Sequence, residues 1–344
     1  MKIMNGSFLV YIRVLAVVLL TALCSQPSTI KAEVDVDEVF KLLPFSDKER
    51  QKILKGEIVK TLPIETADRE LAVGLGFLVK NNPELVETYF LQGKLMDNPE
   101  AIINHRVINT TSDFKALKLT TEEKSEIKKF LAASPGRDLN LGAHEIAAFN
   151  ALKAKGLSDK DSNVQVLAQM QTMLSERYQA YRNGGVSAIA PYELGDGQQF
   201  KLGEYLQSIS EITAVLEKFY PKFHKILLEY PKIKDPDLKE QFFWLKMIVE
   251  GRPTFTLIHR MAMEENGAHV VAARHFYASQ AYNGQQELGI LLPSSKGTLA
   301  VVLTRVSSDE VAGFGSSAKR FIGKRLLASE LAGFFKVVQD KVGK

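Results

Sequence analysis

The sequence has very little cysteine: Cys24 is the only one in 344 residues. An internal disulfide is therefore excluded, and so is a zinc site built from several thiolates. Stability must come from a hydrophobic core, for which a chain of this length with 45% hydrophobic residues has ample material. Because no other cluster of metal ligands is recognisable in the sequence, we expect neither a structural metal nor a cofactor.

A large excess of charge of one sign is also absent. The formal net charge is +4, and residues 1–32 contribute three of these charges through Lys2, Arg13 and Lys31, without any acidic residue. Residues 33–344 therefore carry a net charge of only +1. Proteins that bind nucleic acids usually offer a large basic surplus to the phosphate backbone, so we expect no nucleic-acid partner.

The apolar run near the N-terminus, from Val14 to Cys24, is short for a membrane span, which needs ~20 residues. Basic residues precede this run, and polar residues and the small Ala32 follow it, as in a cleaved secretory signal. We therefore predict a signal peptide at residues 1–32 and a periplasmic or secreted protein. An uncleaved tether is an alternative. A lipoprotein acylated at Cys24 is another, although Leu23 stands where a small residue is expected.

Signatures of common enzyme classes are missing too. No serine lies in G-x-S-x-G, and the six histidines do not form H-E-x-x-H. Two S-x-x-K matches, at Ser125 and Ser316, lack the other β-lactamase motifs, and we interpret both as helix starts. The run GLGFLV at Gly74 ends in valine where a dinucleotide-binding turn has glycine, and it falls within a strand pattern.

The chain after the predicted signal divides into three segments. In residues 33–116, short helices and strands alternate: Ser46 and Glu49 form a capping-box pattern at one helix start, and Asn82 followed by Pro83 marks another. Strands are predicted at EIVKTLPI, ELAVGLGFLVK and NHRVIN, and a further short helix at MDNPEAII. Residues 117–250 have helical spacing and are predicted to form a large α-helical insertion.

Residues 251–344 have a different pattern. Four strand-like runs are separated by ENG, NG and SSKG, which are hairpin signals, so we predict an antiparallel meander. The chain then continues as SSAKRFIGKRLLASELAGFFKVVQDKV, which has the spacing of a long amphipathic helix. The predicted fold class is α+β, with an antiparallel sheet gripping a long C-terminal helix.

This order of elements resembles the helix-grip architecture of START-like and polyketide-cyclase-like proteins, the SRPBCC superfamily. The resemblance covers residues 57–109 and 252–344 and rests on architecture alone, with residues 117–250 as an insertion. The segments YASQAY and AKRFIGKRLL are also similar to uncharacterised secreted bacterial proteins. The helix-grip resemblance implies an apolar cavity between the sheet and the last helix, which takes lipids, sterols or polyketides.

The stretch HVVAARHFYASQAYN, residues 269–283, is the predicted wall of that cavity. Strict alternation along a strand separates its side chains into two sets. The set expected to face the ligand is His275, Tyr277 and Ser279, and the set expected to face the other way is Arg274, Phe276 and Gln280.

The preceding strand, TFTLIHRMAME, adds His259 and Met261 to the predicted ligand-binding set, because both occupy one face of that strand. A filled core would accept most of the same residues. A hydrolytic pair of Ser279 and His275 is excluded, since positions four apart on a strand are separated by ~13 Å. His259, His269 and His275 lie on neighbouring strands, and we interpret them as pocket or surface histidines, without a metal.

The last predicted helix carries four cations within seven residues: Lys319, Arg320, Lys324 and Arg325. One interpretation is transient contact with a membrane surface, through anionic headgroups. The alternative is a solvated helix face opposite an apolar stripe.

The leading hypothesis from the sequence is a non-enzymatic binding protein whose partner is an apolar, lipid-like small molecule. An enzyme of cyclase or hydratase type, with His275, Tyr277 or His259 as acid or base, is the first alternative. A structural or interaction role for the helical insertion is the second.

Overall fold

The computed structural model describes residues 36–43, 45–93, 102–120, 123–136, 138–249, 251–313 and 315–342. All of them belong to one structural unit, residues 33–344. The predicted signal peptide lies outside the described residues, and so does most of the helix expected at MDNPEAII. Within the described ranges, no helix is both long enough and apolar enough to cross a membrane.

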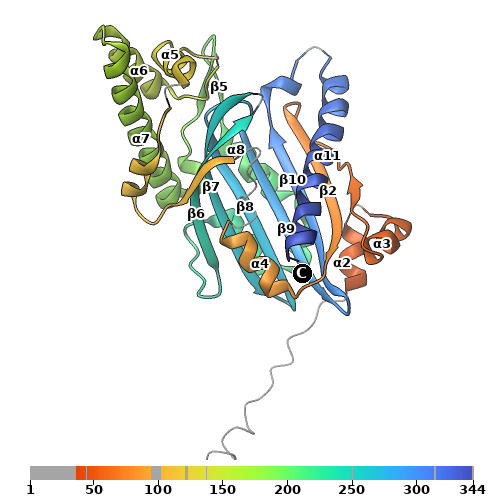
Figure 1. Cartoon of the computed structure of the whole chain (residues 1–344). Coiled ribbons are helices and arrows are strands. Elements are labelled where there is room, and N and C mark those ends of the chain that lie inside the picture. The colour runs from red at the N-terminus through yellow and green to blue at the C-terminus, as the bar shows by residue number, and fades with distance from the viewer. Residues whose placement is uncertain are drawn as a thin grey trace, which may run out of the picture. The chain divides into compact units, whose positions relative to one another are not determined.

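An eight-stranded antiparallel sheet forms the centre of this unit (Figure 1). Strands β6 to β10 form a meander; β2 adds to it beside β10, and β3 adds beside β6. In sheet order the strands are β1 (Val59–Thr61), β2 (Glu70–Val79), β10 (Gly297–Ser307), β9 (Gly284–Ser294), β8 (Ala268–Ala278), β7 (Arg252–Glu265), β6 (Lys239–Val249) and β3 (Ile102–Val107).

The turn between β7 and β8 shows how the sequence determines a hairpin. Asn266 and Gly267 connect the two strands, and both have positive φ, 51° and 78°. A two-residue hairpin turn of type I′ requires positive φ at both positions, and Asn-Gly accepts it at the lowest steric cost. The predicted meander over residues 251–307 is confirmed.

Two helices cover the front face of the sheet, which we define as the face toward the viewer in Figure 1. They are α4 (Pro83–Leu91) and α11 (Ser316–Val342). Helix α11 lies along β2, where Phe335 packs on Phe77 with ring centroids 4.7 Å apart. Asn82 caps α4 by accepting a hydrogen bond from Leu85 N, and Pro83 occupies its first turn, as predicted.

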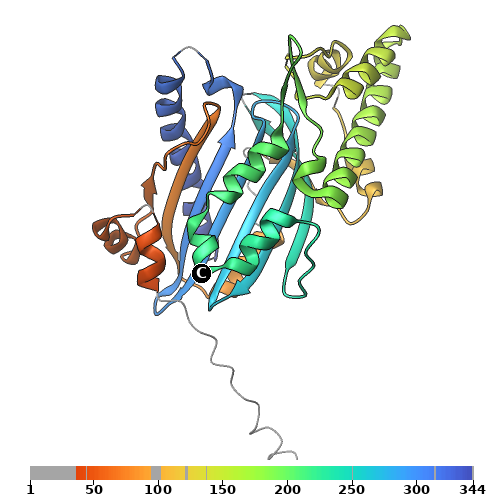
Figure 2. The same ribbon diagram turned by 180° about the vertical axis from the view of Figure 1, so that it is seen from behind.

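Three helices cover the opposite, rear face of the sheet, seen in Figure 2: α8 (Leu202–Glu211), α9 (Ala214–Phe219) and α10 (Pro221–Glu229). Near β1 and β2 lie α2 (Val36–Leu42) and α3 (Asp47–Leu54). The predicted capping box at Ser46 and Glu49 is present at the start of α3.

The remaining helices gather beside the β6 side of the sheet (Figure 1). They are α5 (Lys124–Leu131), α6 (Ala143–Ala154) and α7 (Asp159–Gly184), together with the short turns η2 (Thr111–Ala116) and η4 (Gly185–Ala188). A small hairpin, β4 (Tyr192–Gly195) and β5 (Gln198–Phe200), follows α7, and the turn η5 (Asp309–Val311) precedes α11. The predicted α+β class is therefore observed, with the helical insertion between β3 and the meander.

The structure corrects the predicted boundaries of the helical insertion. Residues 239–249 form strand β6 and pair with both β7 and β3. Phe242 and Trp244 pack into the rear core while Phe243 and Leu245 pack toward the front, so the strand is buried on both faces. A strand of this kind is a continuous apolar run, and its sequence lacks the alternation that distinguishes a strand from a buried helix.

Candidate functional site

A β-bulge in β8 determines which way the predicted cavity residues point. Leu257 pairs with Tyr277, but the next residue, Ile258, pairs with His275, so Phe276 is an extra residue on β8. An extra residue interrupts the alternation of side chains. Phe276 and Tyr277 consequently both point to the rear: Phe276 stacks on Tyr181 of α7, and Tyr277 lies under the guanidinium of Arg177.

The predicted common face of His275, Tyr277 and Ser279 is therefore wrong. His275 points to the front, where it neighbours Arg260, and Tyr277 points to the rear. Ser279 extends the strand pairing: its N–H donates to Phe255 O (2.8 Å), and its Oγ accepts from Phe255 N (3.0 Å). His259 and Met261 are fully buried in the rear core, so the predicted ligand-binding set does not surround one cavity.

A chain of polar side chains runs through the rear layer. Tyr181 Oη lies 3.0 Å from His259 Nδ1, and His259 Nε2 lies 3.0 Å from Glu240 Oε2. Arg274 donates to the Tyr181 hydroxyl from the other side (3.3 Å). The neutral tautomer of His259 with its proton on Nε2 gives each of these groups a hydrogen-bond partner, since Nδ1 then accepts from Tyr181 and Nε2 donates to Glu240.

Burial governs the protonation of this chain. His259 is completely buried, and burial lowers its pKa to about 4, although the neighbouring Glu240 favours the charged form. Burial, the largest single influence, would raise the pKa of Glu240, but the hydrogen bonds from His259 and Tyr230 and the charges of His259 and Arg182 together outweigh it, so the pKa is lowered. At neutral pH, His259 is therefore uncharged and Glu240 is a carboxylate.

Arg274 is buried without a carboxylate partner among the described residues. Its guanidinium donates to Gln286 Oε1, Ser210 Oγ and Leu227 O at 3.0 to 3.2 Å. The oxygens lie on β9, α8 and α10, so one side chain of the sheet is bonded to two of the helices that cover it. This cluster docks the rear helices.

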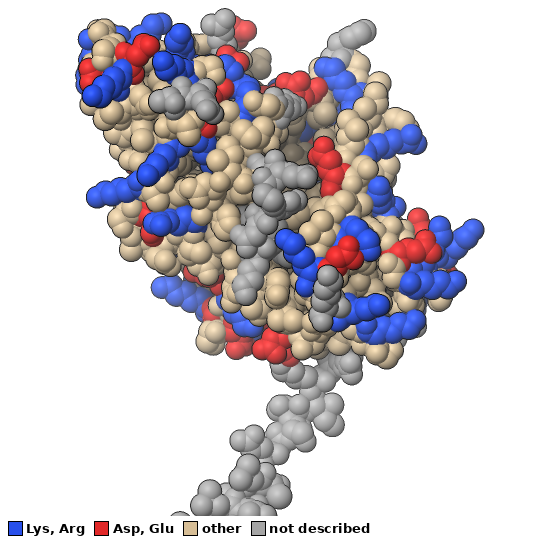
Figure 3. All heavy atoms as spheres, viewed as in Figure 1, with Lys and Arg blue, Asp and Glu red and all other residues tan. Residues whose placement is uncertain are grey.

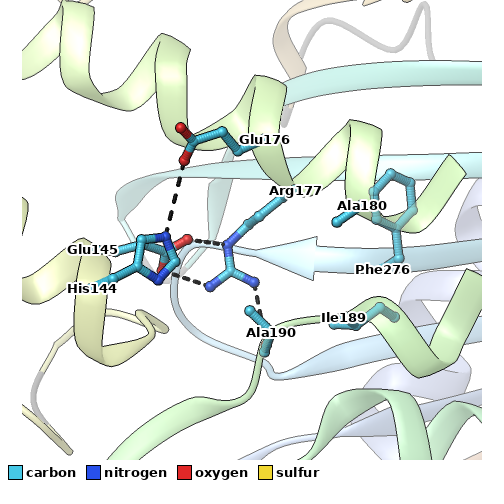
Figure 4. Close-up of a pocket in the computed structure, with 8 residues that line it drawn as sticks. All are labelled: His144, Glu145, Glu176, Arg177, Ala180, Ile189, Ala190 and Phe276. Atoms are coloured by element: carbon cyan, nitrogen blue, oxygen red, sulfur yellow. Dashed lines mark hydrogen bonds and ion pairs between the residues drawn. The ribbon is translucent and has the colours of Figure 1, made fainter. Parts of the chain in front are cut away.

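A second buried arginine is at the base of a small pocket between α6 and α7 (Figure 4). Arg177 forms a two-point ion pair with Glu145, at 2.7 and 2.6 Å, and both side chains are buried. His144 and Glu176 stand at the pocket's exposed side, and Phe276 forms its apolar wall. The pocket holds about 110 Å³.

A polar group also lies on the front face. His275 Nδ1 is 2.8 Å from the Tyr282 hydroxyl, and burial lowers the pKa of His275 to about 3. Arg260, one strand away, donates to Phe90 O and lies between the rings of Phe90 and Phe243. Burial lowers the pKa of this guanidinium to about 10.

An apolar groove opens on the rear side of the sheet, near its β1 end. Its walls are Leu42, Leu43 and Phe45 on one side and residues 212–216, at the junction of α8 and α9, on the other. Its floor comes from β2, β9 and β10, and its volume is about 150 Å³. The hydroxyl of Thr213, a polar member of the lining, is satisfied by Ile209 O (3.2 Å). Sequence reasoning missed this groove because its walls come from three distant segments.

The four cations predicted to contact a membrane all lie in the first half of α11. Arg320 donates to Asp68, and Lys324 forms an ion pair with Glu65 at 2.6 Å. Arg325 lies over the ring of Phe321 at 4.2 Å, and Lys319 Nζ is 3.4 Å from Ala312 O. Arg320 and Lys324 thus form ion pairs with the loop between β1 and β2, at 3.5 Å and 2.6 Å.

Comparison of the chain with protein-family models, with curated proteins and with solved structures found no match. Membership of the helix-grip superfamily therefore stays a prediction. In the described part of the chain, no group of three or more His, Cys, Asp or Glu side chains is arranged to hold a metal ion.

Proposed function

We propose that the protein binds an apolar, lipid-like small molecule in the apolar groove, without chemical conversion. The observation that supports this is the groove itself: an open space of about 150 Å³ between two walls of aliphatic and aromatic side chains. An apolar cavity of ~150 Å³ is large enough for a benzene-sized group. The groove is therefore suited to an acyl segment or one ring of a larger ligand, the rest of which would extend out of its mouth.

The proposed binding site differs in position from the one that the helix-grip resemblance implies. That resemblance places the ligand between the sheet and the last helix, whereas the groove lies on the opposite face of the sheet. The packing of Phe335 on Phe77 fills the space below α11 at that point. The groove also has no charged side chain in its described lining, which favours an uncharged, apolar ligand segment.

The acid–base groups support binding better than catalysis. A general acid or base must come within hydrogen-bond reach of the atom it serves. His259 has both ring nitrogens bonded within the protein and no exposed surface, and Tyr277 is fully buried. An enzymatic role for His275 stays an alternative. Once the ligand is identified, the test is whether the protein converts it chemically.

The test is to fill the groove and measure uptake of an apolar fluorescent probe. Ala214 lies in the groove lining and is exposed, so a Trp there occupies the mouth with little strain. We expect Ala214→Trp to weaken probe binding at least tenfold while the melting temperature changes little. Ala180→Trp fills the pocket beside Arg177 instead, and Ala151→Trp adds the same ring to an exposed position of α6.

Three outcomes separate the possibilities. Loss of binding in Ala214→Trp alone supports the groove. Loss in Ala180→Trp alone would move the ligand to the pocket between α6 and α7. No probe binding by the wild-type protein, or equal binding by all variants, contradicts the proposal.

We also propose that the protein is exported and that residues 1–32 are removed. N-terminal sequencing of the protein from the periplasmic or extracellular fraction tests this. An intact Met1 on cytosolic protein would contradict export, and an acylated Cys24 would replace the soluble protein with a lipoprotein.

A further inference from the structure

Exposed apolar side chains concentrate in one part of the molecule. Of the eleven large hydrophobic side chains exposed in the described part of the chain, five belong to the loop after β1 or to the first half of α11. They are Leu62, Ile64, Phe321, Ile322 and Leu326, and we call them the loop–helix patch. Ile64 is 86% exposed, and Leu326 is 61% exposed. Scattered apolar residues are normal on a surface, but a group of this kind marks an interaction site.

Contacts within the protein hold the loop against the helix. The backbone carbonyl oxygen of Asp68 accepts a hydrogen bond from Arg320 (2.9 Å), and the Glu65 carboxylate pairs with Lys324. Arg305 of β10 donates to Ile64 O (3.4 Å), which fixes the loop to the sheet from the other side. The Glu65 carboxylate is therefore used internally, whereas the Asp68 carboxylate, 3.5 Å from Arg320, stays 91% exposed. The apolar side chains beside them point outward.

The first half of α11 carries two cations without an ion pair among the described residues. Lys319 and Arg325 form no ion pair within the described residues, and both are exposed. The first acidic residue of α11 is Glu330, one turn beyond Leu326. The upper right of Figure 3, where α11 runs, shows uncharged side chains together with Lys and Arg side chains and a few Asp or Glu side chains.

We propose that the loop–helix patch inserts into the interface of an anionic lipid bilayer. Aliphatic and aromatic side chains with cations at their margin are the composition of helices that lie in a membrane interface. The unpaired cations Lys319 and Arg325 complement anionic headgroups. The apolar side chains supply most of the binding, and Lys319 and Arg325 add the preference for anionic lipid. This surface is independent of whether the groove holds a ligand.

Vesicle flotation tests the proposal with the protein isolated from its host, its N-terminus defined by mass spectrometry. Vesicles are phosphatidylcholine alone or phosphatidylcholine with one quarter phosphatidylglycerol. We expect Ile64→Ser combined with Leu326→Ser to weaken partitioning into both at least tenfold. Lys319→Gln combined with Arg325→Gln should weaken partitioning about threefold, and only into the vesicles that contain phosphatidylglycerol.

Val164→Ser combined with Ile103→Ser is the matched control, because both side chains are exposed and lie on α7 and β3, away from the patch. This control should bind vesicles as the wild type does. Circular dichroism and light scattering accompany every variant. No vesicle binding by the wild type, or binding that the Ile64/Leu326 pair does not weaken, overturns the proposal. If the wild-type protein binds no vesicles but forms a dimer, and the Ile64→Ser and Leu326→Ser substitutions together dissociate that dimer, the patch is assigned to a second copy of the chain instead.

Discussion

Helix α11 on the front face and the helices on the rear face are attached to the sheet in different ways. On the front, α11 packs on β2 through apolar side chains such as Phe335, and its polar contacts lie at the margin. On the rear, the helices are bonded to the sheet through buried arginines, tyrosines and a histidine. Apolar packing tolerates sliding, whereas a hydrogen-bond network admits one arrangement. We infer that the rear network specifies how the large insertion docks.

The largest expected effect is on the rear face. Arg177→Met should lower the free energy of unfolding by ~3–5 kcal/mol, because it leaves the Glu145 carboxylate buried without its partner. Urea denaturation measures it. Arg182→Met, on the same helix but exposed, is the control and should cost ~1 kcal/mol or less. Equal effects of the two substitutions would contradict the role of the buried pair.

A comparable loss is expected on the front face for a different reason. Phe335→Ala removes a ring that packs on Phe77, and the cavity left behind should cost ~3–4 kcal/mol. The cost should be nearly the same at pH 5 and pH 7, since no titrating group is involved. A pH-dependent loss would mean that the two faces are coupled.

The pH dependence of stability should come partly from the rear network. The pKa of His259 is about 4 in the folded protein and near 6.5 in an unfolded chain, so the unfolded state binds more protons between these values. The contribution of His259 to the free energy of unfolding is therefore complete above pH 6.5, and it falls by up to ~3 kcal/mol as the pH drops to 4. His259→Gln should flatten the curve of unfolding free energy against pH between 6.5 and 5. Phe335→Ala should shift that curve without flattening it.

The smallest expected effect is at Ser279. It distinguishes a side chain that accepts a hydrogen bond from Phe255 from one that lines a ligand cavity. Ser279→Ala leaves the buried Phe255 N–H without an acceptor and should cost ~1–3 kcal/mol. Uptake of the apolar probe should not change, because Ser279 does not line the groove. Ser279→Trp should unfold or strongly destabilise the protein. A stable Ser279→Trp variant that loses probe binding would restore the predicted cavity.

Local signals predicted much of the fold. The Asn266-Gly267 turn and the caps at Ser46 and Asn82 act within a few residues, so their sequence patterns are sufficient. The helical spacing within residues 117–250 predicts helix at residues 202–229, and this stretch forms three short helices, with breaks at Ile212–Thr213 and at Tyr220. The break at Pro221 follows from its missing N–H, while the earlier break has no comparable signal.

The candidate site was harder to predict because it depends on one extra residue. HFYAS alternates equally well with or without a bulge, so the pattern alone cannot show that Phe276 and Tyr277 share a face. The partners that favour the bulge, Tyr181 and Arg177, lie about a hundred residues earlier in the sequence. Long-range packing therefore decides the direction of these side chains.

The pairing of β2 with β10 has a consequence for how the chain matures. Val79 lies opposite Thr298, more than 200 residues later, while β6 to β10 pair with their immediate sequence neighbours. Closing so long a loop is entropically costly, so the meander can form early and β2 joins late. During synthesis the apolar segment ELAVGLGFLV can pair with the short strand β1, but its edge toward β10 stays unpaired until the last strand has been made. We expect the nascent chain to need a chaperone that shields residues 70–79 throughout most of translation.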